Sequence, residues 1–523
     1  MDFLLHHIVR TSAQRFPDKE ALVHGECRLS YGEVASKVTA LAHGLRRTSL
    51  RRGDRVGIYL DPSIAQVLSI FGISQAGGVF VTINSALFPD QLAHIANDCA
   101  MRGLITTESK LLTLVPVLWK IPTLDFLVVQ RDKQPVETDL PQYDFERLCE
   151  QPPPHEWTDV GIEKDLAALL YTSGSTGKPK GVMLTHAQIL AGSAIVSTYL
   201  GITSNERILA VLPFSFDAGM NQLMTAFHQG GTLILMTFTF AREIVQMLAK
   251  ERVTGLAGVP TLWSLLAQPN STLSKTKLPH LRYITNTGGA MPQAVLATLR
   301  QLLPTTKIFL MYGLTEAFRS TYLPPEELDR RPTSIGKAIP NTEILVVNDQ
   351  GEPCRPGEIG ELVHRGPTVS MGYWGQPELT ARVLRPHPFL PKEVGDKELV
   401  CYSGDLVKMD EEGFLYFIGR RDTMIKSSGY RISPTEVEEV LFQTGKIREA
   451  AVIGVPDEIL GQAIKAFVVP KDSVHVEPDA LLAFCGEKLP RFMVPKYVEV
   501  LTGLPKTSSG KVDYPALRRR EGL

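Results

Sequence analysis

The chain has 523 residues and a formal net charge of −1, because its 55 lysines and arginines nearly balance its 56 aspartates and glutamates. A single hydrophobic core stops growing near roughly 250–300 residues, so at least two domains are expected. The near-neutral charge provides no global attraction for nucleic acid or for an anionic membrane, and neither is expected as a partner.

Cysteine use and the most apolar segments indicate the compartment. The six cysteines lie far apart, with no spacing typical of a disulfide framework or a zinc site, at positions 27, 99, 149, 354, 401 and 485. The segment MDFLLHHIVRTS lacks the basic and long apolar regions of a secretory signal. The most apolar run, residues 65–83, is interrupted by polar residues and falls short of the roughly 20 apolar residues of a membrane span. We therefore expect a cytoplasmic protein.

Apolar runs that are typical of buried strands alternate with helical patterns along the N-terminal part. Strands are predicted at 56–60, 79–83 and 103–107, and helices at 62–77 and 89–100. This alternation favours an α/β architecture with mostly parallel sheets. Residues 130–160 are polar and contain three consecutive prolines, which predicts a surface connection.

The segment LLYTSGSTGKPKGVMLTH, residues 169–186, places a loop rich in glycine and hydroxyl groups between two apolar runs. Glycines let backbone N–H groups converge, and hydroxyls and lysines add donors and charge, so the loop suits a polyphosphate. It differs from the common P-loop because Pro179 follows Lys178 where that motif needs Ser or Thr. A flexible linker would not carry a rigid Pro-Lys-Gly exit between two strands. The predicted polyphosphate-binding residues here are Thr172, Ser173, Gly174, Ser175, Thr176, Gly177, Lys178 and Lys180.

A domain boundary is predicted at residues 419–431, where charged and small residues replace the apolar rhythm. A helix should start at Ser433, with Pro434 in its first turn and Glu436 closing a capping box. Strands near 450–455 and 463–470 and a helix near 478–489 follow. We expect a large body at 1–419 and a small α+β lid at 420–523.

Five motifs in this order resemble the AMP-forming adenylating enzymes, a family that includes acyl-CoA synthetases, peptide-synthetase adenylation domains and luciferases. Besides the loop, the motifs are TNTGGAMP (285–292), YGLTE (312–316), YSGDL (402–406) with GRRDTMIKSSGYRISPTEVE (419–438), and LPKTSSGK (504–511). The resemblance implies that a carboxylate attacks ATP to form acyl-AMP and pyrophosphate, with Mg²⁺, before a thiol accepts the acyl group. A carboxylate is already ionised at pH 7, so no general base is needed.

The resemblance also implies roles for individual residues. Lys511 matches the lysine that bridges carboxylate and phosphate, Glu316 the magnesium carboxylate, and Thr315 a phosphate hydrogen-bond donor. Asp405 matches the ribose acceptor, which Arg420 assists. The adenine walls correspond to Tyr312 and the turn Gly288, Gly289 and Ala290.

The lid is expected to rotate between the two half-reactions. Asp422 matches the hinge position of the family. After rotation, Gly429 and Arg431 would line the tunnel for a phosphopantetheine thiol, while Lys511 withdraws.

The substrate region departs from the acyl and aryl pattern. The stretch LPFSFDAGMNQL (212–223) carries Phe216 at the gate and Asp217 directly after it, a pair that resembles amino-acid adenylation domains. A buried carboxylate needs a cation or several donors, which an amino acid's ammonium supplies. Asp217 could instead cap a helix. The remaining pocket walls are expected to be Met220, Asn221, residues 258–263, Asn286, Thr287, Gly313, Phe318 and Arg319, with Arg319 either a substrate contact or a paired structural charge.

Three functions compete. The first is an amino-acid-activating ligase for proline or a β-amino acid that loads a carrier protein in trans, since no carrier domain follows Leu523. The second is an acyl-CoA synthetase for a medium-chain or aromatic acid, in which Asp217 only caps a helix. The third, a catalytically silent nucleotide-binding scaffold, conflicts with the presence of Lys511, Glu316 and Asp405.

Overall fold

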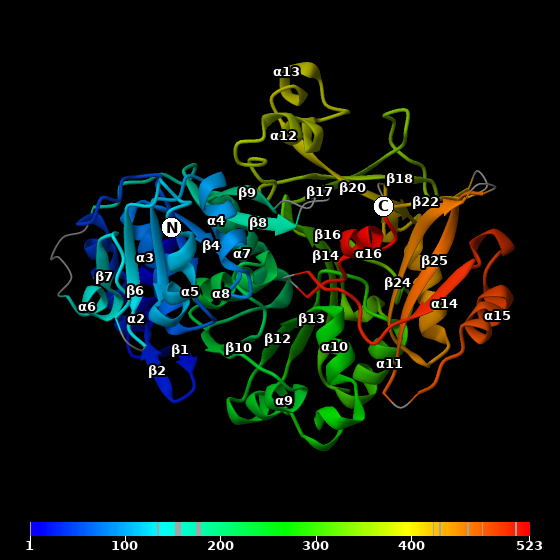
Figure 1. Ribbon diagram of the computed structural model, residues 1–523, viewed down its shortest axis with the longest axis horizontal. Coiled ribbons are helices and arrows are strands. Elements are labelled where there is room, and N and C mark those ends of the chain that lie inside the picture. Colours follow the sequence, from blue (N-terminus) through cyan, green and yellow to red (C-terminus); the bar gives the residue numbers. More distant parts are fainter. Residues whose placement is uncertain are drawn as a thin grey trace.

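The computed structural model describes residues 2–132, 135–151, 158–173, 179–421, 423–427, 430–457, 460–472, 474–507 and 510–523. Four β-sheets and the helices that cover them make up this part of the chain (Figure 1). No helix in these ranges is both long enough and apolar enough to cross a bilayer.

A nine-stranded sheet occupies the centre of the molecule. Its strands, in spatial order, are β16 (Lys337–Ala338), β15 (Ala317–Leu323), β14 (Lys307–Leu314), β13 (Tyr283–Asn286), β12 (Gly255–Gly258), β10 (Arg207–Ala210), β11 (Thr232–Leu235), β1 (Glu20–His24) and β2 (Cys27–Ser30). The six strands from β14 to β1 are parallel, and antiparallel strands close both edges.

A seven-stranded sheet forms the N-terminal side. Its order is β7 (Gln142–Asp144), β6 (Phe126–Gln130), β5 (Gly103–Thr107), β3 (Arg55–Tyr59), β4 (Val79–Thr82), β8 (Leu166–Ser173) and β9 (Pro179–Thr185). All neighbours are parallel except β8 and β9, which flank the glycine-rich loop as an antiparallel pair. The predicted α/β class with mostly parallel sheets is confirmed.

Two smaller antiparallel-rich sheets complete the chain. The first contains β17 (Glu343–Val347), β18 (Ile359–Arg365), β19 (Leu384–Pro386), β20 (Leu399–Met409) and β21 (Leu415–Arg420). The second contains β22 (Ile425–Ser427), β23 (Tyr430–Ile432), β24 (Ile447–Asp457), β25 (Gly461–Pro470) and β26 (Tyr497–Val500). Within the described residues, strands from β22 onward pair only with one another. The division into a body at 1–419 and a lid at 420–523 nevertheless stays a prediction.

The helices alternate with the strands along the body and cover the lid sheet. They are α1 (Leu5–Arg15), α2 (Tyr31–Arg46), α3 (Ile64–Ala76), α4 (Pro89–Asp98), α5 (Glu108–Leu118), α6 (Phe145–Glu150), α7 (His186–Leu200), α8 (Asp217–Gln229), α9 (Ala241–Lys250), α10 (Pro260–Leu266), α11 (Gln293–Leu302), α12 (Pro377–Val383), α13 (Lys392–Gly395), α14 (Pro434–Gln443), α15 (Pro478–Lys488) and α16 (Tyr514–Arg520). Figure 1 shows α14 and α15 beside β24 and β25 at one end, opposite the seven-stranded sheet.

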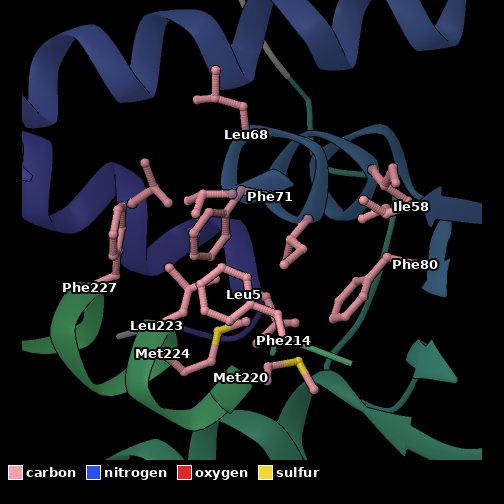
Figure 2. Close-up of a cluster of buried hydrophobic side chains, with 14 of the residues drawn as sticks. Leu5, Ile58, Leu68, Phe71, Phe80, Phe214, Met220, Leu223, Met224 and Phe227 are labelled. Atoms are coloured by element: carbon pink, nitrogen blue, oxygen red, sulfur yellow. The ribbon is translucent and has the colours of Figure 1, made fainter. Parts of the chain in front are cut away.

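The main core lies between the two large sheets. Helix α8 packs against β10, β11 and β12, while α3 packs against β3 and β4, and α1 contacts both helices. Figure 2 shows Met220, Leu223 and Met224 of α8 facing Phe71 and Phe214. Because α8 is buried along most of its length, its residues can line internal cavities as well as the core.

Local chemistry explains both a confirmed and a missed element. The side chain of Ser433 accepts a hydrogen bond from Glu436 N, so α14 starts where its capping residue predicts. Residues 130–160 are more structured than expected, because β7 and α6 lie within them. Helix α6 buries Phe145, Leu148 and Cys149, an apolar set at helical spacing that the surrounding polar residues obscured.

Candidate active site

The glycine-rich loop connects β8 to β9 at the junction of the two large sheets. Strand register pairs Thr172 with Lys180, so the loop ends are held opposite each other. Lys180 Nζ lies 5.7 Å from the ring centroid of Tyr373. Residues 174–178 lie outside the described residues, as does the side chain of Ser173. The predicted roles of Gly174, Ser175, Thr176, Gly177 and Lys178 therefore stay predictions.

The segment 368–374 connects the loop to the turn that carries Glu316. Trp374 N donates to Gly181 O in β9 at 2.8 Å, and Ser370 N donates to Glu316 O at 2.8 Å. The hydroxyl of Tyr373 donates to Glu316 Oε1 at 2.6 Å. Burial and the Glu316 charge raise the pKa of Tyr373, which keeps the phenol protonated as a donor. Tyr373 therefore orients Glu316 through its hydroxyl, while its ring lies beside Lys180.

Thr315 and Glu316 form the two-residue turn between β14 and β15, with Leu314 paired to Ala317. Their position at the end of a parallel strand of a twisted α/β sheet is where ligands bind in such folds. The predicted catalytic pair thus lies at the carboxyl end of β14, where Glu316 O accepts a hydrogen bond from Ser370 N.

Asp405, the predicted ribose acceptor, is buried on β20 between two partners. The hydroxyl of Tyr312 donates to Asp405 Oδ2, and Arg420 Nε lies 3.6 Å from Asp405 Oδ1. Burial, and then the Asp405 charge, raises the pKa of Tyr312 well above its ordinary value. The Tyr312 ring stacks on that of His364, with 6.2 Å between centroids, and burial lowers the pKa of His364 to about 3. The aromatic pair is therefore neutral.

Lys511 brings the C-terminal segment to the body. A β-carbon on Gly288 would lie 3.0 Å from Lys511 Cε, and Gly288 adopts φ +78°, where glycine is favoured. Lys511 Nζ lies 5.3 Å from the ring centroid of Phe216. Gly289 and Ala290 are exposed in the same turn, where Asn286 Nδ2 donates to Gly289 O at 2.8 Å. This arrangement places an ammonium group beside the turn predicted to hold adenine.

An apolar cavity borders α8. The predicted walls Asp217, Met220, Asn221 and Phe318 line it; further lining residues are Leu170, Leu184, Gln188, Ile189, Met224 and Thr368. Asp217 is the first residue of α8, is 8% exposed, and makes no side-chain capping bond, because Phe216 occupies the N-cap. The expectation that Asp217 caps the helix through its side chain is therefore wrong, although its carboxylate lies in the first turn.

A second cavity of similar size lies on the other side of Asn221. Arg319 lines it, and Arg319 Nη1 donates to Thr287 Oγ1 at 2.8 Å. Gly313 lets β14 approach β15, since a β-carbon there would lie 2.9 Å from the backbone of Arg319. Neither cavity has the other predicted walls among its lining residues: Phe216, residues 258–263, Asn286, Thr287 and Gly313.

The comparisons with known proteins agree over nearly the whole chain. The AMP-binding enzyme model matches residues 9–374, and the AMP-binding enzyme C-terminal domain model matches residues 436–511. The chain belongs to the AMP-binding enzyme family. A feruloyl-CoA synthase from Amycolatopsis sp is 35% identical over 98% of this chain and 97% of its own.

Solved structures also resemble this AMP-binding enzyme. An anthranilate CoA ligase in complex with anthranoyl-AMP has a TM-score of 0.88 and 26% identity, covering 99% of this chain and 97% of its own. The o-succinylbenzoate coenzyme A synthetase from Bacillus subtilis, in complex with ATP and magnesium, has a TM-score of 0.82 and 26% identity over 98% and 99% of the two chains. The protein is an AMP-forming, acyl-adenylate-forming ligase that uses ATP.

Sequence reasoning about this AMP-binding enzyme missed Tyr373, which orients Glu316. The only signal was the pair Tyr373-Trp374 between two glycines, a pattern that does not specify a partner. Asp422 and Gly429 lie outside the described residues, as does the side chain of Arg431. The hinge and thiol-tunnel assignments therefore stay predictions.

Proposed function

We propose that this AMP-binding enzyme is an acyl-CoA ligase that activates a compact organic acid as acyl-AMP and transfers the acyl group to coenzyme A. The observation that carries the proposal is Lys511 at the Gly288 turn and beside the gate residue Phe216, whose neighbour Asp217 lines the apolar cavity. The cavity is lined mostly by apolar side chains, which suits the carbon skeleton of an organic acid. The relatives named above support an acid–CoA reaction.

In the first half-reaction, a carboxylate oxygen forms a bond to the α-phosphorus of ATP. The bond from that phosphorus to the oxygen bridging the α- and β-phosphates breaks, and pyrophosphate leaves with the electron pair. Because both reactants are anions, positioning and charge stabilisation lower the barrier. Lys511 supplies positive charge at the joining oxygens, and Lys180 with the glycine-rich loop binds the phosphates. Asp405 holds the ribose hydroxyls.

Glu316 fits a magnesium site. Mg²⁺ is commonly held by one or two carboxylates together with substrate phosphates, and Glu316 presents one carboxylate whose Oε1 is fixed by Tyr373. When bound, the ion neutralises charge on the phosphates. The neighbouring Thr315 hydroxyl donates a hydrogen bond to the same phosphates.

In the second half-reaction, the lid at 420–523 rotates relative to the body at 1–419 about Asp422. Lys511 withdraws, and Gly429 and Arg431 approach the pantetheine arm. The thiol sulfur forms a bond to the acyl carbon, the bond from that carbon to AMP breaks, and the thiol proton passes to solvent. One site thus serves two reactions through lid rotation.

Asp217 is the observation that favours a second candidate, activation of an amino acid. Its carboxylate borders the cavity and forms no ion pair with the described residues. Its place in the first turn of α8, however, lets the positive end of the helix dipole stabilise its charge. An ammonium group on the substrate is therefore not required.

Asp217→Asn distinguishes the two candidates, because it keeps the shape of the side chain and removes its charge. For the acyl-CoA ligase, acids without an amino group, such as benzoate or octanoate, should support AMP and thioester formation, and Asp217→Asn should change kcat/KM by less than about tenfold. The measurement is AMP release with coenzyme A, with thioester mass as a second readout. Activity restricted to amino acids, abolished by Asp217→Asn, would establish the second candidate instead.

A further inference from the structure

Arg319 is a buried cation at the floor of the substrate region. It is 4% exposed and lines the second cavity beside Asn221. It lies in β15 with φ +52°, a left-handed conformation that is unfavourable for a residue with a side chain. Such backbone strain persists where the surroundings fix a residue in place, and it is concentrated at functional sites.

The guanidinium of Arg319 lacks a compensating anion in the part of the chain that the structure describes. Its Nη1 donates a hydrogen bond to Thr287 Oγ1, and its buried Nε reaches no acceptor among the described residues. The second cavity has no aspartate or glutamate among its lining residues. By contrast Arg331, which is 7% exposed, contacts the carboxylates of Glu327, Asp410 and Glu412.

A buried charge without a partner is unfavourable unless something compensates it. Gln222 lines the same cavity, and its Oε1 accepts no hydrogen bond from the described residues. A water or a hydroxyl would satisfy the hydrogen bond but leave the positive charge. An acidic group on the ligand would satisfy both.

We propose that Arg319 binds a second acidic group of the substrate, so that the acid this enzyme activates is a dicarboxylic acid. The inference rests on the proposed acyl-CoA ligase function and names its substrate class. One carboxylate reacts at Lys511, while the other enters the second cavity and pairs with the guanidinium. The apolar cavity lined by Met220 and Phe318 accommodates the intervening carbons.

The test compares acids of equal carbon number with one or two carboxylates: hexanoic with adipic acid, and 3-methylbenzoic with isophthalic acid. Acid-dependent AMP formation with coenzyme A gives kcat and KM for each. The wild-type enzyme should favour a diacid by at least about tenfold in kcat/KM, the range of one charged hydrogen bond. Arg319→Met should lose this preference mainly through a higher KM for the diacid, with monoacid turnover unchanged or improved.

A binding measurement without turnover provides the second readout. A diacid should raise the melting temperature of the wild-type enzyme and leave that of Arg319→Met unchanged. Arg319→Met itself should not lower the melting temperature. Arg331→Met should lower it, because this substitution leaves three carboxylates without their cationic partner. Arg319→Lys, which keeps the charge but not the forked geometry, should recover part of the preference.

Two results would overturn the inference while leaving the proposed function intact. One is a wild-type enzyme that forms thioesters from monoacids and diacids equally well, with the same ratio in Arg319→Met. The other is an equal loss of both acids in the variant, which would place Arg319 at the reacting carboxylate. Absence of AMP formation with every acid would instead contradict the proposed function itself.

Discussion

At the scale of single residues, the pair of Asp405 and Tyr312 shows how a buried carboxylate is kept ready for a ligand. Tyr312 donates to one carboxylate oxygen, while Arg420 lies near the other. These contacts hold the carboxylate in one orientation, in which a ribose would be able to donate two hydroxyls to it. The tyrosine therefore fixes the carboxylate in addition to its predicted role beside the adenine.

Asp405→Ala should raise the KM for ATP by about ten- to a hundredfold, because two charge-assisted hydrogen bonds are lost. The KM for the acid should change little, since Asp405 lines neither cavity. Initial rates at varied ATP and varied acid check this, with Tyr312→Phe as a milder control that keeps the carboxylate. Equal increases in both KM values would count against a ribose role.

Residues also show what the sequence could and could not predict. Lys511, Gly288 and Glu316 lie in sequence motifs that can be recognised without a structure. The structure places Lys511 against Gly288. Arg319 could not be assigned from the sequence, because its pairing depends on long-range packing. Only the structure shows that no described carboxylate reaches it.

At the scale of elements, Glu438 joins three parts of the C-terminal segment. It lies on α14, and its Oε1 accepts from Val452 N of β24 at 2.8 Å and from the Tyr514 hydroxyl of α16 at 2.7 Å. Burial raises the pKa of Glu438 to about 7, from its ordinary value of 4.5. The folded segment therefore prefers the protonated acid.

This raised pKa predicts a dependence of stability on pH. Between about 4.5 and 7 the unfolded chain loses this proton and the folded chain keeps it, so the unfolding free energy falls as pH rises. The total is on the order of 3 kcal/mol. Glu438→Gln should remove this component, making the variant more stable than the wild-type enzyme at pH 8 and similar to it at pH 4.5. Urea unfolding of the full chain measures it.

The exposed Glu487→Gln is the matched control and should show no such divergence. A stability difference between Glu438→Gln and the wild-type enzyme that stays constant with pH would contradict the assignment.

Elements were predicted well where periodicity was uninterrupted. Short runs of buried residues identify β3, β4 and β5 as strands, and a capping serine marks the start of α14. Helix α6 was missed because its six residues provide under two turns, and its apolar face is completed only by packing on α2.

At the scale of the whole molecule, the contact between Lys511 and the Gly288 turn places the C-terminal segment over the nucleotide side of the body. The proposed lid rotation requires this contact in the first half-reaction and not in the second. Lys511→Ala should therefore lower acyl-AMP formation by about 10²- to 10³-fold, the effect typical of removing one charge-stabilising donor.

Transfer from preformed acyl-AMP to coenzyme A should persist in Lys511→Ala. Single-turnover assays of each half-reaction test this, with the exposed lid lysine variant Lys488→Ala as the control. Loss of both half-reactions to the same extent would argue against an alternating lid.

The most direct measurement follows the oxygen atoms of an ¹⁸O-labelled carboxylic acid during turnover with ATP, magnesium and coenzyme A. Because a carboxylate oxygen bonds to the α-phosphorus and stays on AMP when the thiol displaces it, mass spectrometry should find one ¹⁸O in each AMP formed together with acyl-CoA. Label in inorganic phosphate with ADP as the product, or thioester formation without label in AMP, would contradict an acyl-adenylate pathway in this protein.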